Sequence, residues 1–236
     1  MNIIKQYWEW EFPQTEAQVH KEIESAGRTC YKSQEKITDE SALAFVKMIM
    51  SRGHDAILEF YDFKVRAITD RGITHEIVRH RIASYAQEST RYCNYSKDKF
   101  GNELTFILPN YFYEVHNAVE SQTLSKINGK YEAGYFQWLH ILNNCENSYM
   151  EMLKVGLKPQ EARAILPNSL KTEIVMKMNI RQWKHFFSLR AAPAAHPMMQ
   201  ELAQSMLEGF VEKLPTLFGD MKDMLPAASI ETPQVV

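Results

Sequence analysis

Apolar side chains recur along most of the chain every three to four residues, and in a few short segments they alternate with polar ones. The first spacing gives a helix one apolar face, and the second gives a strand one buried face. The helical spacing predicts helices over residues 16–26, 39–52, 70–81, 133–155, 159–165, 181–189 and 198–214. Thr38 and Asp70 are the expected N-caps of two of them, and Gly27 and Gly53 mark two expected ends.

Signals for strands are fewer and shorter. Alternation predicts strands over residues 61–67 and 173–178, and a short apolar run ended by Pro109 predicts a third over 104–108. The polar segment 82–95, rich in Ser and Tyr, predicts a loop or an irregular helix. The expected fold class is therefore α+β, with a small mixed or antiparallel sheet and helices packed around it.

No internal repeat, low-complexity tract or Gly/Ser linker divides the chain, so we expect a single domain over residues 1–236, with 225–236 as a flexible tail. A composition of 45% hydrophobic and 24% charged residues supports a buried core without disulfide or metal staples. A formal charge of -2 makes general coating of nucleic acid unfavourable, and we expect no nucleic-acid partner. The absence of a signal peptide and of a long apolar run predicts a cytoplasmic protein with no membrane partner.

Arginines are concentrated in one stretch, whereas lysines are spread throughout. Five of the ten arginines fall within 26 residues, at Arg66, Arg71, Arg79, Arg81 and Arg91. A planar guanidinium matches phosphate or carboxylate oxygens two at a time, and the hydroxyl and amide side chains before Arg91 strengthen the prediction of an anion site. A second interpretation stays open at this point: these residues form a solvated helix end, where cations are favoured by the C-terminus of the helix.

Several metal and phosphate motifs do not fit the sequence. His75 and His80 are five residues apart, whereas the metalloprotease helix needs two His four apart on one face. The three cysteines, Cys30, Cys93 and Cys145, are widely spaced and form no C-x-x-C pair. We expect no metal site, and any nucleotide is held without a Rossmann or P-loop fold, because neither Gly-rich motif is present.

Arg190 continues an apolar helical stripe. Trp183, Phe186, Phe187 and Arg190 follow the i, i+3, i+4, i+7 pattern, which places the guanidinium in line with the apolar face. The side chain either extends past the helix end into solvent or holds a ligand. The pattern leaves both interpretations open.

Two other candidates receive no role from the pattern. Arg163 can pair with Glu161 or another acid at a surface. Cys93, beside the arginine-rich stretch, is either a nucleophile or a small packed residue, and packing is the more common role of such a cysteine.

The order of several short motifs resembles the flavin-dependent thymidylate synthases. Arg79-His80-Arg81, seven residues and then Ser89 match the R-H-R-x7-S signature of that family. The match extends through Arg91-Tyr92, Gly53-His54 with Glu59, Ala162-Arg163-x-x-Leu166-Pro167, Asn179 with Arg181, and Leu189-Arg190. R-H-R alone is a weak signal, but the ordered set from Glu16 to Leu214 is highly specific.

The resemblance implies an enzyme that methylates dUMP to dTMP. Methylenetetrahydrofolate would donate the carbon, FAD would carry the hydride and NADPH would be the reductant. It also implies a homotetramer in which several subunits assemble each active site. No enzyme nucleophile is implied, which leaves Cys93 as a packing residue and Ser89 as a ligand contact.

The resemblance further implies which residues form the site. FAD would be bound by Arg79, His80, Arg81, Asn179, Arg181, His185 and the backbone of Ala56. The residues around dUMP would be Glu76, Arg79, Gln87, Glu88, Ser89, Thr90, Arg91, Arg163 and Arg190. Arg190 would be catalytic, because a guanidinium at the pyrimidine edge favours the ring deprotonated at N3 and makes C5 electron-rich. Each unit by which it lowers the pKa of N3 corresponds to about 1.4 kcal/mol.

Four positions depart from the family pattern. Many relatives have Gln in place of Glu76, a hydroxyl residue in place of Ala56, His in place of Phe60 and Asp in place of Ala192. Glu76 beside a phosphate is unfavourable unless it pairs with an arginine or accepts a hydrogen bond from the sugar hydroxyl. The departures concern individual contacts rather than the reaction.

Two other functions remain open from the sequence. A nucleotide- or RNA-binding module could use Arg79, Arg81 and Arg91 for phosphate without any chemistry. An inactive homologue could serve as an oligomeric scaffold.

Overall fold

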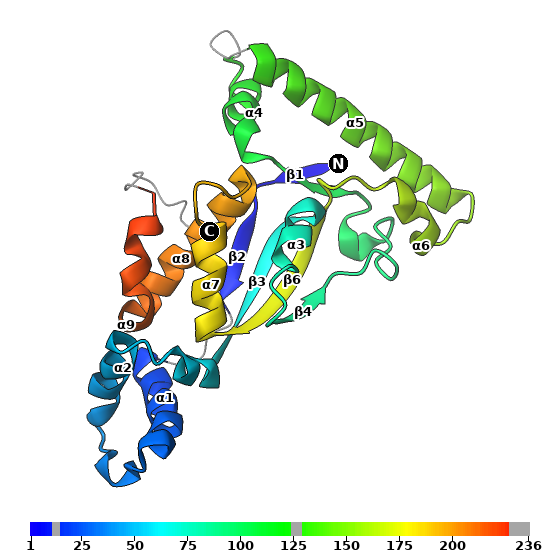
Figure 1. The fold of residues 1–236 in the computed structure, drawn as a ribbon. Coiled ribbons are helices and arrows are strands. Elements are labelled where there is room, and N and C mark those ends of the chain that lie inside the picture. Colours follow the sequence, from blue (N-terminus) through cyan, green and yellow to red (C-terminus); the bar gives the residue numbers. More distant parts are fainter. Residues whose placement is uncertain (11–14, 124–128, 227–236) are drawn as a thin grey trace. The chain divides into compact units, whose positions relative to one another are not determined.

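A computed structural model describes residues 1–10, 15–123 and 129–226 (Figure 1). The chain forms two compact units. The first unit comprises Met1–Glu9, Arg66–Arg79 and Tyr85–Val175, and the second comprises Trp10–Val65, His80–Ser84 and Met176–Val236. The single-domain expectation stays a prediction, and the expected tail at 225–236 lies outside the described residues from residue 227 onward.

Two small sheets confirm the α+β prediction. Four strands form an antiparallel sheet in the order β2 (Tyr7–Trp10), β3 (Asp62–Asp70), β6 (Lys171–Asn179) and β4 (Ser84–Gln87). The strands β1 (Asn2–Ile4) and β5 (Thr105–Ile107) form a separate parallel pair, with Ile3 opposite Phe106. Both β3 and β6 run from one unit into the other.

The three predicted strands are present, at β3, β5 and β6. The interpretation of segment 82–95 as a loop or irregular helix is wrong over Ser84–Gln87, where β4 lies. The half-buried side chains of Tyr85 and Gln87 alternate there with exposed ones. The residues of β4 alternate with the period of a strand, but polar residues take part in the alternation, so a search for apolar alternation does not detect it.

The helices of the second unit are α1 (Glu16–Tyr31), α2 (Ser41–Ser51), α7 (Ile180–Arg190), α8 (Pro197–Lys213) and the short α9 (Pro215–Phe218). The prediction that α1 ends at Gly27 is wrong, because the helix continues to Tyr31 and ends at Lys32, whose φ is 45°. Gly27 instead permits a close approach of α1 and α2, which lie side by side (Figure 1). A Cβ atom at Gly27 would lie 2.6 Å from the ring of Phe45. Glu40, rather than Thr38, is the N-cap of α2.

The helices of the first unit are α3 (Arg71–Ile77), α4 (Tyr113–Glu120), α5 (Gly129–Lys154) and α6 (Pro159–Ala162), the last followed by a 3₁₀ turn over Arg163–Ile165. Asp70 caps α3 as predicted, since its Oδ1 accepts a hydrogen bond from the amide of Ile73 at 2.7 Å. The helix nevertheless ends at Ile77 and not near residue 81. The residues from Arg79 to Arg81 are therefore outside the helix, with the exposed Arg79 directly after its C-cap Val78, and the alternative of cations at a solvated helix end stays open.

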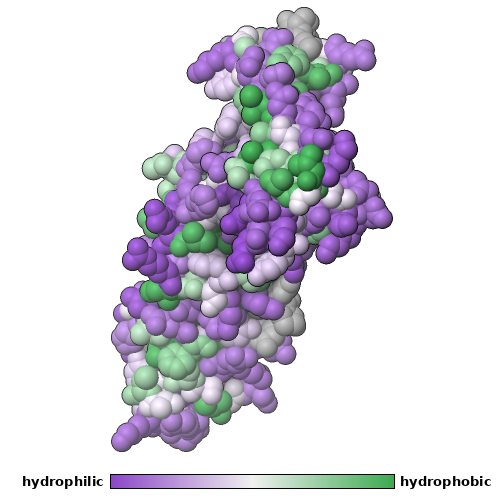
Figure 2. Space-filling model, turned by 90° about the vertical axis from the view of Figure 1, so that its right-hand side faces the viewer, coloured by the Kyte–Doolittle hydropathy of each residue, from purple (hydrophilic) through white to green (hydrophobic). Residues whose placement is uncertain are grey.

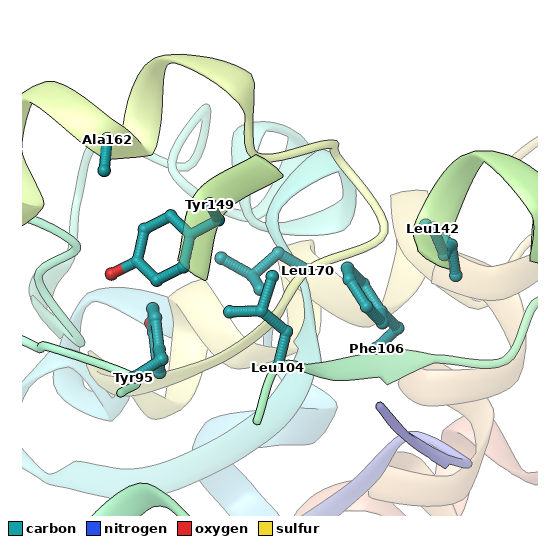
Figure 3. Packing of buried hydrophobic residues seen from close by; sticks show 7 residues of the cluster. All are labelled: Tyr95, Leu104, Phe106, Leu142, Tyr149, Ala162 and Leu170. Carbon is teal, nitrogen blue, oxygen red and sulfur yellow. The ribbon is translucent and has the colours of Figure 1, made fainter. Parts of the chain in front are cut away.

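Each unit has its own core. In the second unit, Trp183, Phe187, Phe210 and Phe218 pack ring against ring, and the centroids of Phe187 and Phe218 both lie 5.0 Å from that of Phe210. In the first unit, Tyr149 lies over Tyr95, with leucines between these rings and Phe106 (Figure 3). Burying one such side chain stabilises the fold by about 1.5–3 kcal/mol.

The face drawn in Figure 2 is mainly hydrophilic, with small apolar groups between the polar ones. Among the residues that the structure describes, no helix combines the length and the apolar character needed to cross a bilayer.

We expect Gly27→Val to lower the free energy of unfolding by about 1–3 kcal/mol, because the new side chain meets the packed ring of Phe45. Urea unfolding followed by circular dichroism measures this change. Gly219→Ala is the matched control, since a Cβ atom at Gly219 meets nothing within 4 Å. Equal stability of Gly27→Val and wild type would contradict the close packing of α1 on α2.

Candidate active site

In the second unit, His80 is held against helix α7. Its ring is buried, with 5% of the residue exposed. Arg190 donates from Nε to His80 Nε2 at 3.0 Å, and the side-chain amide of Gln182 lies 3.3 Å from His80 Nδ1. The rings of Phe186 and His185 pack edge-on at centroid distances of 4.9 and 5.8 Å. Two residues of the predicted site, His80 and Arg190, are therefore in direct contact.

His80 is a neutral base at physiological pH. Burial, then the charge of Arg190 and then that of His185, lower the pKa of the imidazole to about 4. A neutral ring has one nitrogen that accepts and one that donates, whereas an imidazolium has two donors. Neutrality is thus what allows His80 to accept a hydrogen bond from Arg190.

Arg190 ends the apolar stripe that the sequence indicated. Trp183, Phe186 and Phe187 are fully buried, and Arg190 is partly buried as the last residue of α7. Its guanidinium bonds a buried ring, so the interpretation as a side chain extending only into solvent is wrong. A charged donor held on one side by a ring is oriented in the way a ligand-binding arginine requires.

A cavity of about 420 Å³ in the second unit lies beside the predicted FAD contacts Ala56 and Arg181, both of which line it. Gly53, at φ 66°, turns the chain after α2 and leads into His54, whose Nδ1 lies 2.6 Å from the hydroxyl of Tyr31. The two rings are stacked with centroids 6.3 Å apart. The cavity thus combines stacked rings with a guanidinium.

A second cavity of about 340 Å³ shares Asp55 and Arg181 with the first and includes the predicted residue His185. Arg181 Nη1 is bonded to Glu59 at 2.6 Å, which fixes the guanidinium between the two cavities. The side chain of Asn179 does not line either one. It is the N-cap of α7, and its Oδ1 accepts from the amide of Gln182 at 2.8 Å.

In the first unit, a loop after β4 holds several predicted nucleotide contacts. Arg163 Nη1 donates to the Thr90 hydroxyl at 3.4 Å, and Ser89 Oγ accepts from the backbone amide of Arg91 at 3.3 Å. The guanidinium of Arg91 is exposed and lies 5.3 Å from the ring centroid of Tyr92. Arg163, which the pattern alone left unassigned, is therefore brought to the R-H-R-x7-S segment.

The side chains of Gln87 and Glu88 have partners within the first unit. The Gln87 amide donates to the hydroxyls of Thr74 and Thr172 at 3.1 and 3.3 Å. Glu88 accepts from the Tyr95 hydroxyl at 2.5 Å and from Lys171 Nζ at 3.3 Å. Their expected part in the nucleotide site stays a prediction, and their side chains are engaged in fixing the loop.

Lys171 is the centre of a partly buried ion cluster. Burial alone would lower the pKa of its ammonium, but hydrogen bonds to Glu173 and the charge of Glu88 outweigh burial and raise it. The bond from Lys171 correspondingly lowers the pKa of Glu173, which also receives Arg66 at 3.2 Å. Arg66 is therefore part of this cluster, and it is paired with protein carboxylates rather than held for an outside anion.

The remaining predicted residues vary in exposure. Arg79 and Arg81 are exposed on either side of the buried His80, and Glu76 is half-buried on α3.

Burial, followed by the charge of Glu88, raises the pKa of the Cys93 thiol. A raised pKa disfavours the thiolate, which supports packing over nucleophilic attack for Cys93.

Gln182, Tyr31 and Lys171 were not singled out from the sequence. Gln182 follows Asn179 and Arg181 in one matched element, and this proximity was the available signal. Tyr31 and Lys171 offered none, because each gains its role from a contact far away in the sequence.

Comparison with known proteins places the chain in one family. The family described as Thymidylate synthase complementing protein matches residues 14–216. A flavin-dependent thymidylate synthase of Pyrococcus abyssi is 34% identical over 184 residues, which cover 77% of this chain and 68% of the relative. Enzymes of the same name from Geobacter sulfurreducens and Corynebacterium aurimucosum are each 32% identical, over 83% and 90% of this chain and 78% and 84% of the relatives.

The chain therefore belongs to the flavin-dependent thymidylate synthase family. The resemblance drawn from R-H-R-x7-S and its accompanying motifs is confirmed over most of the chain. The homology supports an enzyme of this family with a flavin cofactor.

The lowered pKa of His80 predicts a loss of stability in acid. The unfolded ring titrates near its ordinary value of 6.5 and the folded ring near 4, so the unfolded state binds more protons between these values. The stabilisation by neutral His80 is thus complete above pH 6.5 and is lost as the pH falls to about 4. Urea unfolding across this range should show a steeper fall for wild type than for His80→Gln. His140→Gln, at an exposed ring, should keep the wild-type slope, and identical slopes for all three proteins would refute the prediction.

The ion cluster predicts a contrast between two lysines of β6. Lys171→Met leaves Glu88 and Glu173 without their shared cation in a partly buried site, and we expect a loss of about 2–4 kcal/mol in the free energy of unfolding. Lys177→Met removes only an exposed pair with Asp62 and should cost less than about 1 kcal/mol. Denaturant unfolding of both variants at pH 7 measures the difference. Similar losses would show that the cluster does not stabilise the first unit.

Proposed function

We propose that this chain catalyses the reductive methylation of dUMP to dTMP, with methylenetetrahydrofolate as the carbon donor, FAD as the hydride carrier and NADPH as the reductant. Membership of the flavin-dependent thymidylate synthase family supports the reaction class. The observation that carries the proposal is the contact between Arg190 and neutral His80, two residues of separate family motifs that the fold joins at one place.

The residues of the second unit suit a flavin nucleotide. Stacked Tyr31 and His54 offer planar surfaces in the cavity lined by Ala56, and Arg181 offers charge for a phosphate. A bound FAD supplies the hydride transfer, which no protein side chain can perform. We assign its binding to Arg79, His80, Arg81, Asn179, Arg181, His185 and Ala56. Asn179 and Ala56 would contribute through backbone, since the Asn179 side chain caps α7.

As the family resemblance implies, we assign dUMP binding to residues that include Arg79, Arg91, Arg163 and Arg190. Arg79, Arg91 and Arg163 are exposed cations, and Ser89 and Thr90 supply hydroxyls beside them. Gln87 and Glu88 would contribute backbone groups and hold the loop in place through Thr172 and Lys171. Glu76 would accept from a sugar hydroxyl, because a carboxylate is unfavourable beside phosphate.

The chemical role of Arg190 follows from its charge. A guanidinium at the pyrimidine edge stabilises the ring deprotonated at N3, and this raises the electron density at C5, where the carbon is added. No enzyme nucleophile is needed, in agreement with the raised pKa of Cys93. As the family resemblance implies, we further propose a homotetramer in which subunits share the active sites.

The test is formation of dTMP from dUMP, methylenetetrahydrofolate and NADPH, measured by mass spectrometry with FAD supplied or withheld. We expect product only when FAD is present. Arg190→Ala should reduce kcat by about 100-fold or more, because it removes a charge that acts on the reacting ring, and should retain much of the dUMP affinity.

Arg52→Ala is the matched control, since Arg52 is an exposed arginine of the same unit outside both cavities. Wild-type turnover by Arg190→Ala would remove Arg190 from the mechanism. Folded wild-type protein that binds dUMP but forms no dTMP would instead support a nucleotide-binding module without chemistry.

A further inference from the structure

The contact with Arg190 identifies the tautomer of His80. An arginine side chain has only donors, so the His80 Nε2 atom at 3.0 Å from Arg190 Nε must be an acceptor. The neutral imidazole then holds its proton on Nδ1. The opposite tautomer would set two N–H groups against each other at hydrogen-bond distance.

The tautomer in turn indicates which atom of the Gln182 amide must face the ring. The structure places the amide nitrogen Nε2 of Gln182 at 3.3 Å from His80 Nδ1, but a donor at Nδ1 requires an acceptor opposite. A half-turn about the last side-chain bond exchanges the oxygen and nitrogen of an amide, and the Nδ1–H tautomer requires this turn, which brings Oε1 opposite Nδ1–H. Oε1, the ring and the guanidinium thus form a directional chain from Gln182 through His80 to Arg190.

Gln182 is buried, and its backbone is held at the start of α7. The residue is 7% exposed, and its backbone amide donates to the N-cap side chain of Asn179 at 2.8 Å. A neutral acceptor is suited to this position, because a carboxylate would favour an imidazolium. An imidazolium has no lone pair for Arg190.

We propose that Gln182 is a positioning residue for Arg190, acting through the tautomer of His80. The inference rests on the proposed function in that it assigns the orientation of the activating arginine to a residue outside the proposed substrate and cofactor contacts. It adds Gln182 to the residues on which the reaction depends.

The first measurement is the tautomer of His80 in the wild-type full chain, by ¹⁵N NMR of protein labelled in histidine. The His80 signals are identified by their loss in His80→Gln. We expect a neutral ring with the proton on Nδ1 at pH 7. A ring protonated on Nε2 would overturn the proposal without any variant having to fold.

The second measurement compares Gln182→Met with Gln18→Met. Methionine keeps the length of glutamine but its thioether is only a weak hydrogen-bond acceptor, so the Nδ1–H form should lose its preference and kcat should fall by roughly 10- to 100-fold. The KM for dUMP should stay within about twofold, because the lost orientation acts on turnover. Gln18→Met removes the hydrogen bonds of an exposed glutamine in α1 of the same unit and should leave both the tautomer and kcat unchanged.

Gln182→Glu supplies a readout that a merely structural role would not give. The charges of Arg190 and His185 on α7 disfavour an imidazolium, and the exposed Arg79 and Arg81 flank His80 in the sequence. The new carboxylate opposes them and should raise the pKa of His80. Because only the neutral ring accepts from Arg190, the activity of this variant should rise with pH through that raised pKa.

The outcomes separate the two proposals. Loss of the Nδ1–H preference and of kcat in Gln182→Met supports the positioning role, whereas a wild-type tautomer and kcat in that variant overturns it. Wild-type protein that forms no dTMP contradicts the proposed function, but the NMR spectra still decide whether Gln182 sets the ring.

Discussion

The hydrogen bond from Arg190 Nε to His80 Nε2 is the interaction on which the proposed chemistry depends. It exists only while the imidazole is neutral, and the ring is neutral because it is buried against Phe186 and α7. The aromatic packing of the second unit therefore does more than stabilise the fold. It sets the charge state of the ring that orients Arg190.

In the first unit, neighbouring charges keep a partly buried side chain charged. Lys171 is partly buried, yet it stays protonated because Glu88 and Glu173 surround it. Its bond to Glu88 fixes the start of the loop that carries Ser89, Thr90 and Arg91. Removing one member of such a cluster is costly, because it leaves the remaining charges partly buried without their partner.

Periodicity predicted those features that depend on neighbours in the sequence. The stripe of Trp183, Phe186 and Phe187, with Arg190 at its end, follows from helical spacing alone. Gly27 misled the same reasoning because its role is set by Phe45 on another helix. The cation Lys171 has no local signal, since it is defined by partners brought close only by folding. Gln182 adjoins the matched residues Asn179 and Arg181, but its contact with His80 also depends on folding.

The position of a residue in a family motif indicates where its backbone lies. It is a weaker guide to the direction of the side chain. Tyr85 and Gln87 alternate with exposed residues in β4, so Gln87 faces Thr74 and Thr172 inside the first unit. Glu88, just after the strand, is drawn to Lys171. A residue can therefore hold its place in a signature while its side chain serves the scaffold. Contacts to a nucleotide at such positions are best sought in the peptide groups, whose direction the strand and the loop already fix.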